Sequence, residues 1–130
     1  MRLKDTRAIA LRLGVPDPRL LRSWLRSLNY VRNVIAHHGR LWNSKIVERP
    51  GFPSQAGVIP AFDALLPYPN SNSTVYGSCC ILAYLSRVIN PQSQWHKKLV
   101  ASIKTFPVMP HTSVSDMGFP PNWESHDFWN

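Results

Sequence analysis

Residues 17–39, DPRLLRSWLRSLNYVRNVIAHHG, contain the longest uninterrupted helical pattern of the chain. Asp17 suits the N-cap position, and Pro18 suits the first helical position, where its missing N–H costs nothing. No further proline or glycine follows until Gly39, the expected C-cap residue. Apolar residues recur three and four positions apart, which predicts a helix from Pro18 to about His38. Its buried stripe is expected to contain Leu21, Trp24, Leu25, Leu28, Val31 and Ile35.

The opposite face of this helix is basic, because Arg19, Arg22 and Arg26 fall on or beside it. Residues 1–45 hold ten of the 15 Lys and Arg residues and only two acidic residues, so the net charge of +8 is concentrated in the first third of the chain. Such a cationic block attracts polyanions and speeds their encounter. The pattern favours nucleic-acid binding, although a solvated helix face that keeps the protein in solution has the same charges.

Three further helices are predicted from apolar spacing. The first covers residues 3–13. A strongly apolar one covers 73–89 and is expected to be the most buried, with Gly77 marking a close helix contact. The last covers about 92–105, and Asn90-Pro91 supplies its N-cap and its first-position proline. The apolar positions are Leu3, Ala10, Leu11 and Leu13 in the first helix and Trp95, Leu99 and Ile103 in the last.

The remaining segments lack a regular pattern. Residues 44–72 are rich in Pro and Gly, which predicts a long irregular loop interrupted by one turn of helix at 61–66. Residues 106–130 combine prolines with aromatic residues and suit an extended tail held across the bundle by aromatic anchors. The anchors are Phe119, Trp123, Phe128 and Trp129. No segment shows the alternating apolar pattern of a β-strand. We therefore expect a single all-α domain over residues 1–130, a small helical bundle.

Composition argues against several other classes of protein. No apolar run approaches the roughly 18 to 20 residues that cross a bilayer, and the charged N-terminus is unlike a signal peptide. Cys79 and Cys80 are adjacent in an apolar helix, which indicates reduced core thiols and a reducing compartment. We therefore expect a cytoplasmic protein. A metal site at His37 and His38 is disfavoured, because adjacent helical residues diverge and no cysteine or carboxylate cluster completes the set.

Arg32, Asn33 and His37 together offer a fixed cation, an amide and a side chain that titrates near neutral pH. These groups suit metal-free RNA cleavage, in which the 2'-hydroxyl attacks the neighbouring phosphate and an arginine stabilises the added negative charge. On a helix, however, Arg32 stands about 140° and about 7.5 Å from His37. A two-fold dimer that joins two such helix ends would supply both proton-transfer groups in one cleft. The other interpretation is a solvated helix end, where the macrodipole favours protonated histidines.

The extended motif Arg32-Asn33-x-x-Ala36-His37-His38-x-Arg40-Leu41-Trp42-Asn43 closely resembles the signature of Abi-like proteins of bacterial abortive-infection phage defence. These proteins, of the AbiD/AbiF type, belong to the HEPN superfamily of helical ribonucleases. Residues 116–123 are similar to the C-terminus of this family, and the chain resembles the C-terminal portion of its members. The resemblance implies a helical HEPN bundle and a metal-independent endoribonuclease that needs no cofactor and has a composite dimeric site.

The resemblance also implies roles for individual residues. Arg32 and His37 match the two catalytic positions, and Asn33 matches the polar residue that accompanies them. The residues expected to contact RNA are His38, Arg40, Arg19, Arg22, Arg26 and Trp42. The expected partners are RNA, a second copy of the chain, and a non-coding RNA, guide RNA or antitoxin. The alternative is a HEPN module that binds RNA or protein without cleaving, as an antitoxin or scaffold would.

Overall fold

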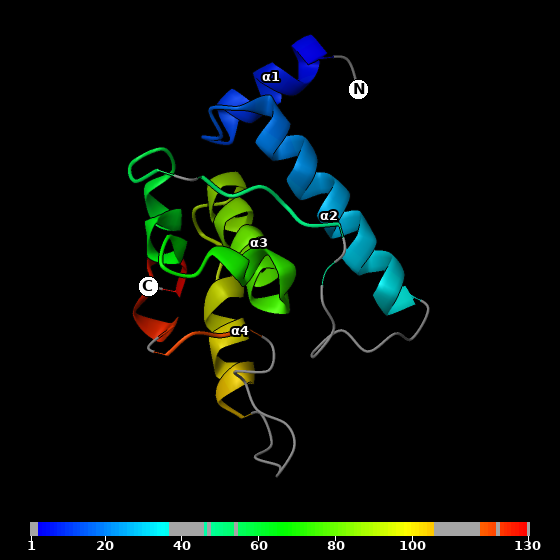
Figure 1. The fold of residues 1–130 in the computed structure, drawn as a ribbon. Coiled ribbons are helices and arrows are strands. Elements are labelled where there is room, and N and C mark those ends of the chain that lie inside the picture. The colour runs from blue at the N-terminus through cyan, green and yellow to red at the C-terminus, as the bar shows by residue number, and fades with distance from the viewer. Residues whose placement is uncertain are drawn as a thin grey trace.

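The computed structural model describes residues 3–36, 46, 48–53, 55–105, 118–121 and 123–129. Within these residues the chain is helical and contains no strand, so the predicted all-α fold is confirmed (Figure 1). The α-helices are α1 (Leu3–Arg12), α2 (Pro18–Ala36), α3 (Val75–Ile89) and α4 (Trp95–Lys104). Short 3-10 helices are η1 (Pro60–Leu65), η2 (Pro69–Ser73), η4 (Trp123–Ser125) and η5 (Asp127–Trp129).

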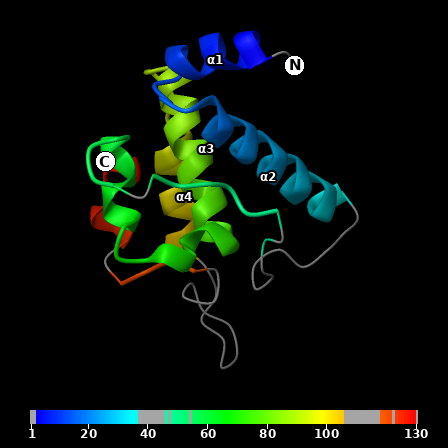
Figure 2. The ribbon, with the colours of Figure 1, turned by 45° about the horizontal axis from the view of Figure 1, so that its top comes forward.

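Helix α3 forms the centre of the bundle. It packs against α2, α4, η2 and η5, while α1 packs against α2. Figures 1 and 2 show α2 on one side of α3, with η1 and the C-terminal turns on the other. Seven of the 15 residues of α3 are buried, more than in any other helix of the described chain, including Tyr76, Cys80, Ile81, Ala83 and Leu85. The prediction that this segment is the most buried helix is therefore confirmed.

Helix α2 begins as predicted, because the backbone N–H of Arg19 donates to Asp17 Oδ1 at 2.9 Å and completes the N-cap. The buried stripe contains Leu21, Trp24 and Val31, with Leu28 partly covered. Leu25 was expected in this stripe, but it is 44% exposed. It stands about 100° around the helix from Trp24, beyond the covered arc, whereas Ser27 lies inside that arc and is buried. The predicted helix end at His38, its cap Gly39 and the Ile35 side chain lie outside the described residues.

Helix α1 is close to its prediction in extent but not in its buried face. Gly14 follows it with φ of 73°, the left-handed conformation expected of a C-cap residue. Ala10 is buried and Leu13 is partly buried, whereas Leu11 is 66% exposed, so that part of the prediction was wrong. Leu11 is one position from Ala10 and therefore lies about 100° away from the strip that α2 covers.

Helix α4 begins at Trp95 rather than at residue 92, because Asn90 forms a turn instead of a helix cap. Its Oδ1 accepts the backbone N–H of Gln92 at 3.1 Å, and its carbonyl oxygen accepts that of Ser93 at 2.9 Å. Asparagine before proline suits turns as well as N-caps, so the sequence Asn90-Pro91 is compatible with either structure. Trp95, Leu99 and Ile103 are only partly buried, and the fully buried side chain of α4 is His96.

The described part of the predicted loop, within residues 44–72, packs against the helices. The Trp24 indole Nε1 donates to the carbonyl oxygen of Gly51 at 2.6 Å, and the N–H of Gly51 donates to Ser23 Oγ at 2.8 Å. Helix η1 supplies the expected turn of helix near residues 61–66 and buries Phe62 and Leu65. This segment therefore covers α2 and contributes to the same core.

The described end of the chain is held by the predicted aromatic anchors, since Phe119, Trp123, Phe128 and Trp129 are all buried. It forms the short helices η4 and η5 rather than the expected extended tail, and residues 106–117 lie outside the described part. The indole of Trp129 donates to the Tyr76 hydroxyl at 3.2 Å. Because an indole can only donate, the Tyr76 hydroxyl is free to donate to His126 Nδ1, which lies 2.7 Å away.

Gly77 lies where α3 meets η2. A β-carbon at this position would collide with the carbonyl oxygen of Ser71 and would lie 3.2 Å from the α-carbon of Asn72. The prediction that Gly77 marks a close contact is confirmed.

We expect Gly77→Ala to lower the free energy of unfolding by about 2 to 3 kcal/mol, because backbone must move to admit the methyl group. Helix propensity alone would give the opposite sign, a gain of about 1 kcal/mol. Urea unfolding followed by circular dichroism measures the difference. Gly57→Ala is the control, since a β-carbon there meets nothing within 4 Å and only its φ of 86° opposes the change. A more stable Gly77→Ala protein would contradict the collision.

His96 is 4% exposed, and its Nδ1 has no hydrogen-bond partner in the described structure. Burial, and then the positive charges of Arg87 and Lys97, hold its pKa below the usual value. The unfolded chain therefore binds a proton at His96 more readily than the folded one. We expect stability to be lost as the pH falls through about 6.5 toward the lower folded pKa. Unfolding free energies at about pH 7.5 and about pH 5 should differ less for His96→Leu than for the wild type, and an unchanged difference would exclude His96 as the cause.

Candidate functional site

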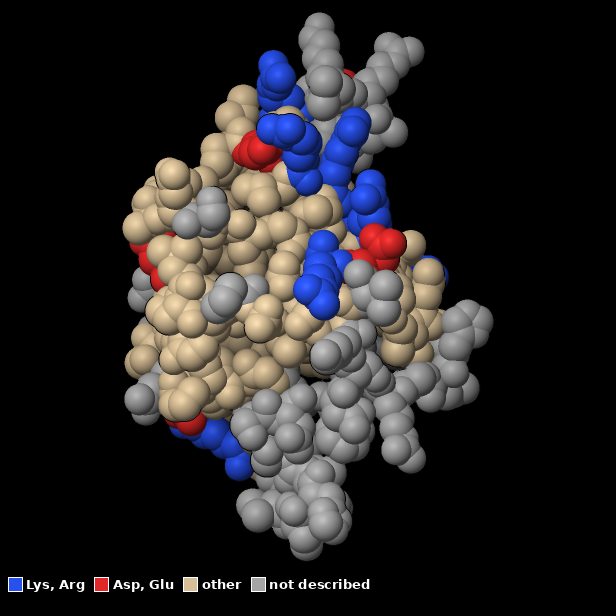
Figure 3. Space-filling model, in the orientation of Figure 1, with Lys and Arg blue, Asp and Glu red and all other residues tan. Residues whose placement is uncertain are grey.

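The outward side of α2 forms one continuous polar face, which we call the α2 outer face. At about 100° per residue its members fall within an arc of about 140°. They are the exposed residues Arg19, Arg22, Leu25, Arg26, Asn29, Arg32, Asn33 and Ala36. Every charged residue on this face is an arginine. Figure 3 shows Lys and Arg side chains gathered along the side of the molecule formed by α1 and α2.

One arginine of the α2 outer face, Arg19, is paired with an acidic residue, Asp17. Asp17 is bonded by the backbone N–H of Arg19, which is the main cause of its lowered pKa, and then by the Arg19 side chain at 3.3 Å. This exposed pair stabilises the fold little, because water screens it. A second ion pair joins Lys104 to Glu124, away from α2. Arg26 and Arg32 therefore face solvent without an acidic partner among the described residues.

Arg32 and Asn33 lie next to each other near the end of the described α2, and both are exposed. The structure thus leaves two of the three predicted catalytic residues open to a ligand. The third, His37, and the predicted RNA contacts His38, Arg40 and Trp42 lie outside the described residues.

Asn29 is a polar member of the α2 outer face that the site prediction omitted. It follows Arg22 by seven residues and Arg26 by three, and it precedes Asn33 by four. These spacings put the four side chains in one row along the helix. The row offers two guanidinium groups followed by two amides, which donate to phosphate and can also bond to base edges. The spacing was present in the sequence and would have identified Asn29.

Burial excludes three side chains from a role in ligand binding or nucleophilic chemistry. Trp24 is fully buried, so it belongs to the core and is no platform for a base. Cys79 and Cys80 are free thiols, as predicted. Burial raises the pKa of Cys79 to about 12 and is the main cause of the raised pKa of Cys80. Both thiols are therefore protonated at neutral pH and poor nucleophiles.

Across the described residues, no three His, Cys, Asp or Glu side chains group as metal ligands would. None of the helices in the described part of the chain has both the length and the apolar character needed to cross a membrane.

Comparison with known families shows that residues 1–43 match the model of the family described as Abi-like protein. The matched stretch includes α1 and α2 and every residue of the extended motif from Arg32 to Asn43. It does not include residues 116–123, which also resembled this family by sequence. No curated protein and no solved structure matches the chain. The match supports a relationship to Abi-like proteins, and such a relationship suggests a role in abortive-infection defence.

Proposed function

We propose, starting from the similarity of residues 1–43 to Abi-like proteins, that this chain is a metal-independent endoribonuclease of the HEPN type that acts in anti-phage abortive infection. The observation that carries the proposal is that Arg32 and Asn33 are both exposed on a helix face whose charged residues are all arginines. A guanidinium that is accessible and has no acidic partner among the described residues is available to a phosphate.

The proposed reaction needs only groups of the protein and the RNA. A base takes the proton of a 2'-hydroxyl, whose oxygen forms a bond to the adjacent phosphorus. The bond from phosphorus to the 5'-oxygen breaks, and an acid protonates that oxygen. The products are a 2',3'-cyclic phosphate and a 5'-hydroxyl. His37 serves in proton transfer, Arg32 stabilises the charge that develops on the phosphate, and Asn33 positions it by hydrogen bonds.

The remaining arginines of the α2 outer face are proposed to bind the RNA backbone. Arg19, Arg22 and Arg26 span about 10 Å along the helix axis, so one strand can contact them in turn before it reaches Arg32. Binding through these contacts releases counterions and should weaken as salt is added.

A homodimer is part of the proposal, because one chain presents one Arg32 and one His37, whereas cleavage needs both an acid and a base. Leu25 is the large apolar side chain of the α2 outer face and is 44% exposed. It lies two turns before Arg32 on the same side of the helix. A two-fold axis running along α2 would bring both copies of Leu25 together and both copies of Arg32 together.

We expect Leu25→Asp to shift the protein from dimer to monomer, because two carboxylates would meet where two leucines packed. Light scattering at micromolar concentration measures the mass directly. Leu82→Asp is the control, since Leu82 is similarly exposed, at 39%, but belongs to α3. A monomeric wild type, or an unchanged mass for Leu25→Asp, would contradict this dimer.

The test of the function is cleavage of single-stranded RNA in the presence of EDTA by the wild type, Arg32→Ala and His37→Ala. We expect only the wild type to cleave rapidly, to leave cyclic phosphate ends, and to spare a substrate whose 2'-hydroxyl is absent at the cleaved position. Equal cleavage by all three proteins would show that Arg32 and His37 take no part in catalysis. Salt-sensitive RNA binding without cleavage by any of them would favour a non-catalytic RNA-binding module.

A further inference from the structure

Asn29 lies near the centre of the α2 outer face. It follows Arg26 by three residues and precedes Arg32 by three, so it stands midway between them along the helix axis, about 4.5 Å from each. At about 100° per residue, Arg32 points about 60° to one side of Asn29, and Asn33 points about 40° to the other. An RNA strand that contacts both Arg26 and Arg32 therefore passes over Asn29.

The fold does not explain an asparagine at position 29. Asparagine is less favourable inside a helix than arginine or alanine. Asn29 is exposed, and its side chain forms no hydrogen bond to a described residue, so it neither caps α2 nor satisfies a buried polar group there. An amide without a role in the described fold is available to a ligand.

The amide of Asn29 differs from the neighbouring guanidinium groups in its hydrogen-bonding capacity. A guanidinium only donates, whereas an amide donates through its nitrogen and accepts through its oxygen. An ionised phosphate can only accept, so it leaves the amide oxygen unused. The edge of a base offers donors beside acceptors and can satisfy both ends of the amide.

Adenine suits such an amide in a single strand. Its N6 amino group is a donor that stands between two acceptors, N1 on the Watson–Crick edge and N7 on the Hoogsteen edge. Both edges are accessible when the base is unpaired, so an amide can form two hydrogen bonds to either edge. A pair of this kind favours the matching base by about fivefold or more.

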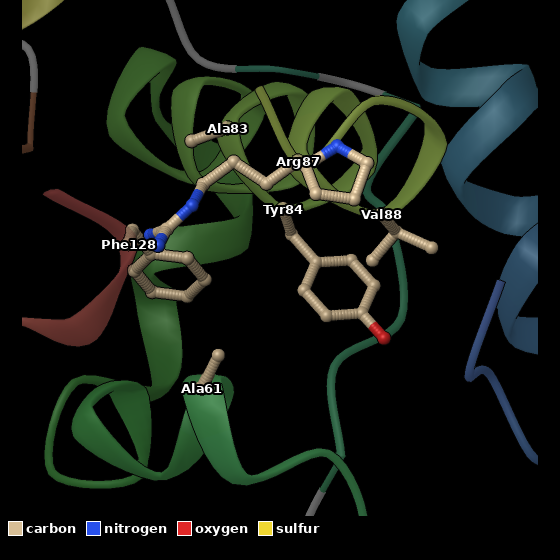
Figure 4. A pocket seen from close by; sticks show the side chains of 7 residues that line it. Ala61, Ala83, Tyr84, Arg87, Val88 and Phe128 are labelled. Carbon is tan, nitrogen blue, oxygen red and sulfur yellow. The ribbon is translucent and has the colours of Figure 1, made fainter. Parts of the chain in front are cut away.

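A cavity elsewhere in the molecule is not formed by the surface that would hold the RNA strand. This cavity, of about 410 Å³, opens between η1, the second half of α3 and η5 (Figure 4). Ala61 and Ala83 leave the space open, and Tyr84, Arg87 and Phe128 lie around it. None of its lining residues belongs to α2, so we assign base recognition to the α2 outer face.

We propose that Asn29 recognises a base of the RNA and favours adenine in the nucleotide next to the phosphate that Arg32 contacts. The proposal rests on the proposed function, because Arg32 fixes where the strand lies. It goes further by naming the residue that selects the sequence. Asn29 bonds to the base and takes no part in proton transfer.

The first test is cleavage of four RNAs that differ only in the base next to the cleaved phosphate, with each side varied in turn. We expect the wild-type kcat/KM for adenine to exceed that for every other base by about fivefold or more on one of the two sides. Asn29→Ala should reduce this preference to about twofold or less. Asn29→Gln keeps the amide and should retain part of the preference.

Asn70→Ala is the matched control. Asn70 is also an exposed asparagine, but it belongs to η2, so its removal should leave the full preference for adenine. Asn29→Ala should stay folded, because alanine is the better helix former at an exposed position, and circular dichroism checks this.

A binding assay separates this inference from the test of cleavage. Short 2'-O-methyl strands of adenine, cytosine or uracil have no 2'-hydroxyl to attack, and fluorescence anisotropy measures their affinity. The wild type should bind the adenine strand more tightly by about fivefold or more, and Asn29→Ala should bind all three alike. Arg26→Ala should weaken all three by the same factor, because a phosphate contact carries no sequence information.

The outcomes distinguish the two proposals. A preference for adenine in binding that is lost in Asn29→Ala would support base recognition even if no protein cleaved RNA, and only the proposed catalysis would then fail. Cleavage without a preference for adenine would leave the proposed function standing and overturn the role of Asn29. A preference that survives Asn29→Ala, or no binding of any strand, would overturn that role as well.

Discussion

Arg32→Ala is expected to lower kcat for RNA cleavage by about 100-fold or more, whereas Arg26→Ala should leave kcat nearly unchanged and raise KM. Both arginines are exposed on the same face of α2, and neither has an acidic partner among the described residues. They differ in the proposed role, since only Arg32 meets the phosphate at which bonds form and break. A group that acts on developing charge affects kcat, and one that holds distant backbone affects binding.

Single-turnover cleavage with excess protein separates the two effects, because all RNA is then bound. Arg32→Lys keeps the charge but loses the planar fork of donors, so its rate should lie between those of the wild type and Arg32→Ala. Removal of Arg26 should also lower the salt dependence of RNA binding by about one counterion. Equal kcat values for Arg32→Ala and Arg26→Ala would show that Arg32, like Arg26, only binds the RNA backbone and does not act on the reacting phosphate.

Trp24→Ala is expected to cost about 3 to 5 kcal/mol of unfolding free energy, a large share of the stability of a domain of this size. Trp24 is fully buried and joins α2 to three other parts of the chain. Its ring stacks on Phe62 with centroids 5.2 Å apart and meets Tyr84 edge-on at 5.9 Å. Its Nε1 donates to Gly51 at 2.6 Å, so one side chain holds α2, η1, α3 and the loop together.

Two further variants show which part of this contact matters. Trp24→Phe retains a ring but leaves the Gly51 carbonyl without its donor, and we expect a loss of about 1 to 3 kcal/mol. Leu82→Ala on α3 is the exposed control, with an expected loss of about 1 kcal/mol or less. Urea unfolding measures all three variants. A loss for Trp24→Ala no larger than that for Leu82→Ala would show that Trp24 does not join these elements.

Much of the fold could be predicted because its signals are local. Asp17 starts α2 by accepting the backbone N–H of Arg19, Pro18 fits the first helical position because no N–H is needed there, and Gly14 ends the preceding helix through its own φ. Asn90 shows the limit of this approach. Its side chain can form either a turn or a helix cap, and in the structure it forms the turn, with α4 beginning at Trp95.

The candidate site was also predictable from the sequence only in part. The row of arginines on α2 follows from helical spacing, and the exposure of Arg32 and Asn33 agrees with it. The roles of Arg32, Asn33 and His37 came from the resemblance to a family, and the match over residues 1–43 supports that family without testing the chemistry. The cavity beside Arg87 had no sequence signal, because its lining residues come from η1, α3, η5 and the turn between α3 and α4.

The sequence by itself determined that the chain is all-α, where α2 begins, and that one face of α2 is lined with arginines, because helix geometry turns residue spacing into direction. Tertiary packing decided which apolar residues are covered. Leu11 and Leu25 remain exposed while Ser27 and His96 are buried, since the width of each covered strip depends on the neighbouring element and not on the helix itself. The cavity at Arg87 likewise exists only because distant aromatic rings meet around two alanines.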